Sequence, residues 1–324
     1  MKKRTIRPLF GLVCCCIIAA TALTSCRDHF DIDSLRNLSK LVVYCFPSQA
    51  DTTYISVSNS MGVRKVTDIR KAILLHNARV SYTVNGQPRQ VQQLADGTFY
   101  VIGSHQTGDH VSLLVEHDDY GRAEAHTTVP ESTAITLQEV RLITEYDADW
   151  GSAQDFYQLP ATFDDPAAST DYYAVRVHVK GNDQGLGIDA NWPQVYVNDE
   201  PLLNRLTAID EDFGFENDFY QRFYFFNDRD INGQQYTLHL NVKVNHLEKR
   251  VRNPRFQVQL YRLTPEYYHY LKSINDIENN ELAQGGFAQL TPTYSNVSGG
   301  LGLVAGFWAS GSEWITVETQ NTDE

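Results

Sequence analysis

The feature that most restricts the fold is the recurrence of short strand-like segments, each followed by a turn signal, about every ten residues. Residues 78–84, for example, alternate apolar and polar side chains and stop at the hairpin dipeptide Asn85-Gly86. In the first half, strands are indicated at residues 41–46, 53–58, 78–84, 98–102, 110–116 and 123–129. Short strands at this spacing favour a β-sandwich of the immunoglobulin or transthyretin type.

The second half continues the strand pattern and adds aromatic side chains, which we expect to supply much of its core. Strands are indicated at residues 135–140, 172–179, 221–226, 236–242 and 255–261. One segment differs, because Thr264, Pro265 and Glu266 offer an N-cap, a first-turn proline and an acid near the positive end of a helix dipole. Apolar residues then follow at helical spacing, so we predict a helix over residues 265–279, with an irregular loop as the alternative.

Pro130 and the two residues after it indicate a junction between two domains. The sequence therefore predicts an all-β fold with two β-sandwich-like domains in tandem and one short helix near the C-terminus. The N-terminal β-sandwich is expected to cover residues 40–130, and the C-terminal β-rich domain residues 131–324. We find no repeat of fixed period, so the two halves are not recognisable copies.

The first 26 residues are organised as a lipoprotein export signal. Four basic residues among the first seven precede an apolar run over residues 9–23, which is too short to span a bilayer comfortably. The run ends in Leu-Thr-Ser-Cys at residues 23–26, a lipobox in which the Cys26 sulfur accepts a diacylglycerol and its freed amine a further acyl chain such as palmitate. We expect residues 1–25 to be the signal peptide and residues 26–39 a lipidated tether. An ordinary cleaved secretory signal, or a buried helix, is the alternative.

Loss of this leader would leave 299 residues and, by removing four basic side chains, shift the formal net charge from −13 to −17. Such an acidic surface argues against binding nucleic acid or anionic headgroups by charge. Cys45 would be the one cysteine left besides the acylated Cys26, which excludes a disulfide within the mature chain. Because Cys45 lies in an apolar strand-like run, we favour a small core residue over a reactive thiol. No later apolar stretch approaches ~18 residues, so the lipid is the expected sole membrane anchor.

Residues 228–233 match the first six positions of a calcium-binding loop, with Asp228, Asp230, Asn232 and Gly233 in the characteristic places. Position twelve of such a loop needs a bidentate carboxylate, but here it is His239. We therefore favour a tight connection between two strands, with Asn232 and Gly233 at positive φ, and we predict no metal site.

Two further acidic groups could hold a cation or stack on a sugar, but solvated loops are the favoured interpretation. The first group interleaves acids with phenylalanines and consists of Asp210, Glu211, Asp212, Phe213, Phe215, Glu216, Asp218 and Phe219. The second group precedes Gly151 and consists of Asp147, Asp149 and Trp150. The first half also has four histidines whose spacing suits no common zinc site, namely His105, His110, His117 and His126.

Catalytic signatures are weak throughout the sequence. No spacing singles out one pair of carboxylates for glycoside hydrolysis, and no nucleophile elbow, P-loop, dinucleotide fingerprint or zinc-protease motif is present. The glycine-rich residues 298–302 lack the lysine and the strand-to-helix context of a phosphate loop, so close backbone packing explains them better. We therefore predict no catalytic residues and no cofactor, and the ligand-binding residues stay unknown.

A series of segments occurs in a characteristic order along the chain, at residues 26–33, 40–43, 55–60, 77–80, 85–86, 127–130, 164–166, 171–173, 226–234, 263–268 and 295–306. In this order the segments resemble those of the DUF4249 lipoproteins of the Bacteroidetes. Each is a turn or a strand with no diagnostic chemistry, and their order covers nearly the whole mature chain.

The resemblance implies an outer-membrane lipoprotein, often encoded beside a TonB-dependent receptor, and therefore a non-enzymatic accessory or ligand-capturing role in nutrient uptake. It also implies display on the cell exterior, because acids such as Asp28, Asp31 and Asp33 behind the lipidated cysteine favour surface sorting. Two alternatives stay open. One is a fimbrillin-like structural or adhesion subunit, and the other is a surface hydrolase of glycans or peptides.

Overall fold

The computed structural model describes residues 39–60, 74–147, 151–181, 193–197, 199–204, 219–244, 253–279 and 292–317, all within one compact unit, Ser39–Glu324. The predicted signal peptide, Cys26 and nearly all of the tether lie outside the described residues. The fold is all-β, as predicted, with four sheets that pair into two sandwiches. The described residues include the α-helix α4 (Pro265–Glu278) and the 3-10 turn η2 (Tyr220–Arg222).

The first sandwich packs a five-stranded sheet, β16-β1-β2-β6-β5, against a four-stranded sheet, β4-β3-β7-β8. Its strands are β1 (Leu41–Cys45), β2 (Thr52–Asn59), β3 (Arg79–Val84), β4 (Gln87–Arg89), β5 (Val91–Gln93), β6 (Phe99–Ile102), β7 (His110–His117), β8 (Gly121–Thr128) and β16 (Leu301–Val304). The β3–β4 hairpin turns at Asn85 and Gly86, whose φ angles of 51° and 76° confirm the predicted turn.

Alternation along these strands places one side-chain row in the core. In β1, Leu41, Val43 and Cys45 are buried, while the residues between them are partly exposed. Burial raises the pKa of the Cys45 thiol, so the prediction of a small core residue is confirmed.

The second sandwich packs β10-β11-β14, with β9 also on β11, against β13-β12-β15-β17, with β18 also on β15. Its strands are β9 (Ile135–Leu137), β10 (Arg141–Asp147), β11 (Ser152–Asp164), β12 (Tyr172–Lys180), β13 (Tyr224–Asn227), β14 (Gln235–Lys243), β15 (Arg255–Leu263), β17 (Phe307–Gly311) and β18 (Ile315–Thr316). The strand predicted at residues 221–226 begins only at Tyr224. Gln221 and Arg222 each have a φ of 54°, which an extended strand cannot contain.

The longest strand, β11, tolerates a proline because of where its partners end. Asp165 donates its amide to Gln234 of the β14 side, so by alternation the amide position of Pro160 faces the opposite edge of the strand. On that edge β10 pairs up to Gln158, and β9 pairs only from Ala161 onward. The missing N–H of Pro160 therefore falls in a gap between two partner strands.

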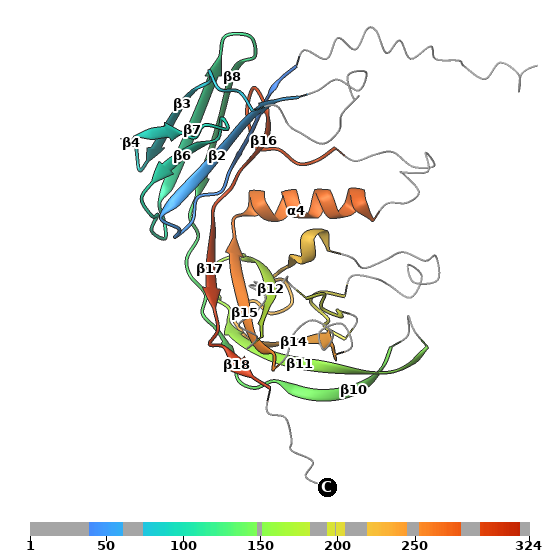
Figure 1. The fold of residues 1–324 in the computed structure, drawn as a ribbon. Helices are drawn as coiled ribbons and strands as arrows, with labels where there is room; N and C mark the ends of the chain where they lie inside the picture. The colour runs from blue at the N-terminus through green and yellow to red at the C-terminus, as the bar shows by residue number, and fades with distance from the viewer. Residues whose placement is uncertain are drawn as a thin grey trace, which may run out of the picture. The chain divides into compact units, whose positions relative to one another are not determined.

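β16 comes from near the C-terminus but belongs to the first sandwich, where it pairs in parallel with β1. In Figure 1 this orange-red strand lies among the blue strands of the N-terminal region. Gly302 lies opposite Val43, and a Cβ on Gly302 would overlap the Val43 carbonyl oxygen. The glycine-rich run therefore serves close backbone packing, as predicted. The predicted domain boundary between residues 130 and 131 stays a prediction. β16 lies in the predicted second domain by sequence but forms part of the first sandwich.

After β16 the chain enters the second sandwich through contacts that join both cores. Gly306 donates its amide to Thr127 Oγ1 at 2.9 Å, and Phe307 donates its amide to the Pro47 oxygen at 3.1 Å. The helix α4 adds ring contacts, with Tyr267 centred 5.1 Å from Phe46. The two sandwiches are thus joined by the returning C-terminal segment as well as by the linker near Pro130.

The predicted helix is confirmed as α4, with Pro265 in its first turn and Glu266 beside it. Its buried face includes Tyr268 and Leu271, which pack against the second core. The expected side-chain cap is absent, because Thr264 Oγ1 makes no capping bond and, within the described part of the chain, is buried without a partner. The start of the helix is fixed instead by the backbone, since the Thr264 amide donates to the Gly306 oxygen.

Candidate functional site

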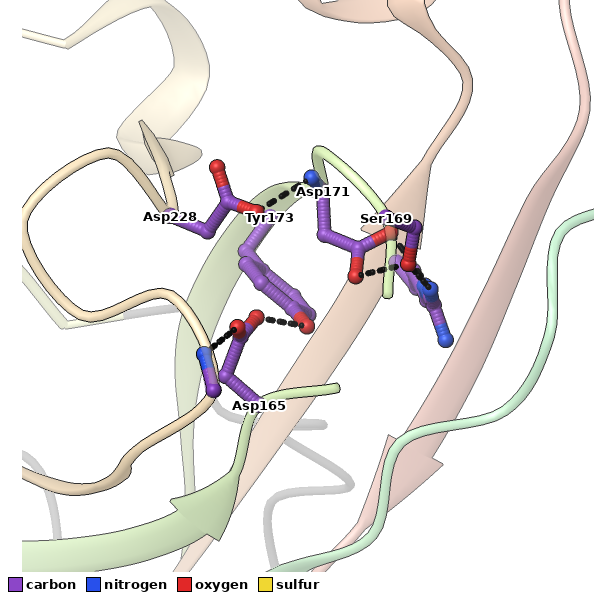
Figure 2. Close-up of polar contacts among 7 residues, drawn as sticks. Asp165, Ser169, Asp171, Tyr173 and Asp228 are labelled. Atoms are coloured by element: carbon purple, nitrogen blue, oxygen red, sulfur yellow. Dashed lines mark hydrogen bonds and ion pairs between the residues drawn. The ribbon is translucent and has the colours of Figure 1, made fainter. Parts of the chain in front are cut away.

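Three buried carboxylates meet where the second sandwich changes sheets. Asp165 follows β11, Asp171 precedes β12 and Asp228 follows β13, and one oxygen from each lies within 4.8 Å of the others (Figure 2). The connection from β11 to β12 crosses between the two sheets, and the connection from β13 to β14 crosses back. Both crossovers lie at the same end of the sandwich, which brings together acids that are far apart in the sequence. We name Asp165, Asp171 and Asp228 the aspartate cluster.

Hydrogen bonds tie this cluster to both crossovers. Asp165 accepts the Tyr173 hydroxyl at 2.7 Å and the Gly233 amide at 2.8 Å, one on each carboxylate oxygen. Asp228 Oδ2 accepts the Asp171 amide at 2.7 Å (Figure 2). Each acid thus bonds a group on the other connection or on the strand beside it.

One cation lies within this group of acids. Arg262 of β15 pairs with Asp171 Oδ1, and Ser169 donates to Asp171 Oδ2 at 2.8 Å. The side chains of Arg262 and Asp171 are less than a tenth exposed. Among the described residues, one guanidinium therefore faces three carboxylates. Burial, and then the charges of Asp165 and Asp171, raise the pKa of Asp228 above its ordinary value.

The closeness of the two crossovers also explains Gly233. Its φ is 73°, and a Cβ there would lie 2.7 Å from the Ala167 Cβ on the other connection. The structure supports the prediction of a tight connection with Gly233 at positive φ. Asn232 was expected to share that conformation, and this part of the prediction is wrong, because Asn232 is not among the residues with positive φ.

The aspartate cluster is chemically suited to two tasks. Carboxylate oxygens are the preferred ligands of Ca²⁺, so the three acids could hold a hard cation. However, both oxygens of Asp165 and of Asp171 already accept protein donors. The geometry therefore fits a structural link between the two crossovers, in which protein donors already occupy most of the carboxylate oxygens.

Of the acids in the calcium-like string at residues 228–233, only Asp228 belongs to the aspartate cluster. Asp230 and Asn232 are exposed, and His239 lies in β14 and donates its amide to Glu200. The ligands that accompany Asp228 come from the other crossover, which no linear motif could show. Asp165 and Asp171 were missed as site residues. The sequence feature that they share, and that could have identified them, is an acid immediately next to an aromatic-rich strand: Asp165 follows β11 and Asp171 precedes β12.

The histidines of the first half lie in separate places. His105 accepts from or donates to Tyr82 at 2.7 Å, His117 bonds Asn77 at 2.9 Å, and His126 bonds Ser112 at 2.9 Å. Among the described residues, the aspartate cluster is the one group of three or more acids, histidines or cysteines close enough to share a metal ion.

The remaining sequence candidates mostly lie outside the described residues. This applies to Cys26, to the acids and phenylalanines between residues 210 and 218, to Asp149 and Trp150, and to the side chain of Asp147. Phe219 is described and is buried in the second core. Sequence reasoning overlooked Glu200, a fully buried acid whose carboxylate accepts the Tyr236 hydroxyl and the His239 amide.

Comparisons with known proteins give few functional clues. No curated protein matches the sequence. Among solved structures, a chain described as a membrane-anchored protein of Corynebacterium diphtheriae is 10% identical, with 69% of this chain and 54% of that chain covered. This chain thus spans about half the length of that relative, and a TM-score of 0.20 supports no argument about shared fold or function. Within the described residues, no helix has the length and apolar character needed to cross a membrane.

A family model matches most of the chain. It covers residues 27–310 and bears the description "Domain of unknown function (DUF4249)". The match includes the first sandwich with β16, the aspartate cluster and all strands of the second sandwich except β18 and the end of β17. The chain belongs to the DUF4249 family.

Proposed function

We propose that this protein is a non-enzymatic lipoprotein of the outer membrane that captures or presents a ligand for a TonB-dependent receptor. The lipobox at residues 23–26 carries the proposal, because a cysteine in that setting receives a lipid anchor. The acids at Asp28, Asp31 and Asp33 support an orientation toward the cell exterior.

The body of the protein suits a role as a stiff carrier on a tether. Two sandwiches joined by a returning segment, with β16 in the first and β17 in the second, resist bending at their junction better than domains joined by one linker. A contact made at one end of the body would then be held at a defined position from the other end. The tether at residues 26–39 supplies reach between the membrane and this body.

Exposed apolar side chains on the first sandwich give a surface to test for partner binding. Tyr54 on β2 is 58% exposed and Ile102 on β6 is 61% exposed, and their strands are paired. The Tyr54 ring lies 6.5 Å from the ring of Tyr100 on β6. Large exposed apolar groups that lie together are typical of surfaces that bind another molecule.

Affinity purification of the tagged protein from cross-linked outer membranes tests the proposal. We expect a β-barrel receptor to copurify with the native protein, and the double variant Tyr54→Ser, Ile102→Ser to recover less of it. Leu142→Ser is the matched control, since Leu142 is 62% exposed but lies on β10 of the second sandwich. Repeated recovery without any receptor would contradict the partnership, whereas the membrane anchor is tested separately through Cys26.

A further inference from the structure

The outer face of the β10-β11-β14 sheet brings together a second pair of acids that is independent of the aspartate cluster. Glu145 lies on β10, and Asp199 lies in the segment 193–204 that packs along β14. The Asp199 carboxyl lies close enough to the Glu145 carboxyl to change its pKa. Burial is the main cause of the raised pKa of Glu145, and the nearby Asp199 carboxyl adds to it. Two carboxyl groups this close repel one another when both are ionised, which favours a shared proton or a bound cation.

A buried amide beside this pair provides a separate observation. Asn241 of β14 is 1% exposed, and its Nδ2 donates to Glu145 Oε2 at 3.1 Å, which places the amide group beside Glu145. Its other end, Oδ1, is buried and has no hydrogen-bond partner in the part of the chain that the structure describes. A buried carbonyl oxygen without a donor is destabilising, so an occupant that fills this coordination position is favoured.

We propose that Glu145, Asp199 and Asn241 Oδ1 form a binding site for a hard divalent cation of the Ca²⁺ type. Such a cation takes oxygen ligands and accepts a mixture of carboxylates, amide oxygens and water. The three residues offer oxygens of both protein kinds. Water can supply the remaining ligands, because Asp199 is exposed and Glu145 is only partly buried.

The neighbouring charged groups fit this assignment. Glu200 already accepts the Tyr236 hydroxyl and the amides of Leu202 and His239, so it is engaged in holding the segment and is not needed as a ligand. Lys243 directs its Nζ toward the Tyr196 ring, 6.0 Å from the ring centre.

A bound cation would fasten the segment 193–204 to the sheet. The segment is already held by the Tyr196 amide, which donates to the Asn241 oxygen at 2.7 Å, and by Glu200 on the His239 amide at 2.8 Å. The cation would add a third attachment that joins Asp199 to β10 as well as to β14. The segment would therefore be more firmly ordered when the cation is bound.

Terbium luminescence on the purified full-length protein, stripped with chelator and then titrated, gives a direct test. Tyr196 bonds the Asn241 main chain and stacks 5.3 Å from Phe156, which places a sensitising ring beside the site. We expect Tb³⁺ emission that Ca²⁺ displaces, and at least tenfold weaker binding for Glu145→Gln and for Asp199→Asn. A calcium-dependent rise in the melting temperature of the native protein, absent from both variants, is the second readout.

Two control variants separate this site from the other acids. Asp230→Asn alters the exposed calcium-like string, and Asp228→Asn alters the aspartate cluster; we expect binding unchanged in both. Absence of Tb³⁺ and Ca²⁺ binding by the native protein would overturn the proposal. So would binding that Asp228→Asn weakens while Glu145→Gln and Asp199→Asn leave it intact, because the cation would then lie in the aspartate cluster.

Discussion

The two sandwiches have the same architecture but bury different chemistry. The first core is aliphatic, with Tyr82 and Phe99 as its aromatic members among the described residues. The second core is rich in phenylalanine and tyrosine. The buried acids of the described chain, Asp165, Asp171, Glu200 and Asp228, all lie in the second sandwich, as does the buried Arg262.

The two sandwiches are also completed differently. The first acquires an edge strand, β16, from a distant part of the chain, so its completion depends on backbone fit. The second holds its two crossovers together through the aspartate cluster, so its completion depends on charge balance and hydrogen bonding. We therefore expect the stability of the first sandwich to respond mainly to changes in side-chain volume, and that of the second to changes in charge.

The largest effect is expected where the charge balance of the second sandwich is broken. Arg262→Met removes the one guanidinium that pairs with Asp171 and leaves three buried carboxylates without a cation. Removal of one partner from a buried ion pair costs about 3–5 kcal/mol, so we predict a loss of this size in the free energy of unfolding measured with denaturant. Arg79→Met is the control, since its ion pair with Asp118 is exposed and should be dispensable. Equal losses in both variants would remove the proposed difference between the cores.

The next effect probes backbone fit in the first sandwich. Gly302→Ala places a Cβ against the Val43 oxygen at a φ of 111°, so β16 must move away from β1. Overpacking costs about 1–3 kcal/mol, and we predict a loss near the upper end by the same denaturation experiment. Gly86→Ala isolates the conformational cost, because Gly86 has a φ of 76° with open space around its Cβ position. A loss at Gly302 no greater than that at Gly86 would argue against the packing explanation.

A smaller effect should appear as pH sensitivity of the second sandwich. The pKa of Asp228 is raised above its ordinary 3.8, so its contribution to stability is complete below pH 3.8 and is lost as pH rises through the folded pKa. Asp228→Asn keeps an acceptor for the Asp171 amide but cannot ionise. In the presence of chelator, we predict that this variant gains stability relative to the native protein between pH 4 and pH 7. Parallel stability profiles over that range would refute the assignment.

The first sandwich should show the opposite and smallest dependence. His105 is buried between the Tyr82 hydroxyl and the Ser48 oxygen, and burial lowers its pKa below 6.5. Its contribution to stability is present above pH 6.5 and is lost as pH falls through the folded pKa. We predict that His105→Gln flattens the decline in stability on the acid side of pH 6.5. A decline of unchanged steepness in the variant would show that another group is responsible.

Local patterns in the sequence predicted those elements whose determinants are adjacent in the chain. The Asn85-Gly86 turn and α4 depend on consecutive residues, and both are confirmed. β11 was missed because Pro160 argues against a strand unless the ends of β9 and β10 are known. The role of β16 was missed because parallel pairing with β1 joins residues more than 250 positions apart.

The candidate site was predictable only in part for the same reason. Asp228 was visible in a linear motif, but Asp165 and Asp171 reach it through a crossover between two sheets. A motif search looks for residues at a fixed sequence spacing, whereas these three acids are distant in the sequence and are brought together by the chain topology. The Glu145, Asp199 and Asn241 group is likewise formed by three elements that no single segment contains.

The central claim, that this two-sandwich body is carried on a lipid at Cys26, is tested most directly by mass spectrometry of the N-terminal peptide of the protein isolated from membranes. We predict a mature chain that starts at Cys26, with a diacylglyceryl group on its sulfur and a fatty acyl group on its amine. A peptide that retains residues 1–25, or an unmodified Cys26, would contradict the account.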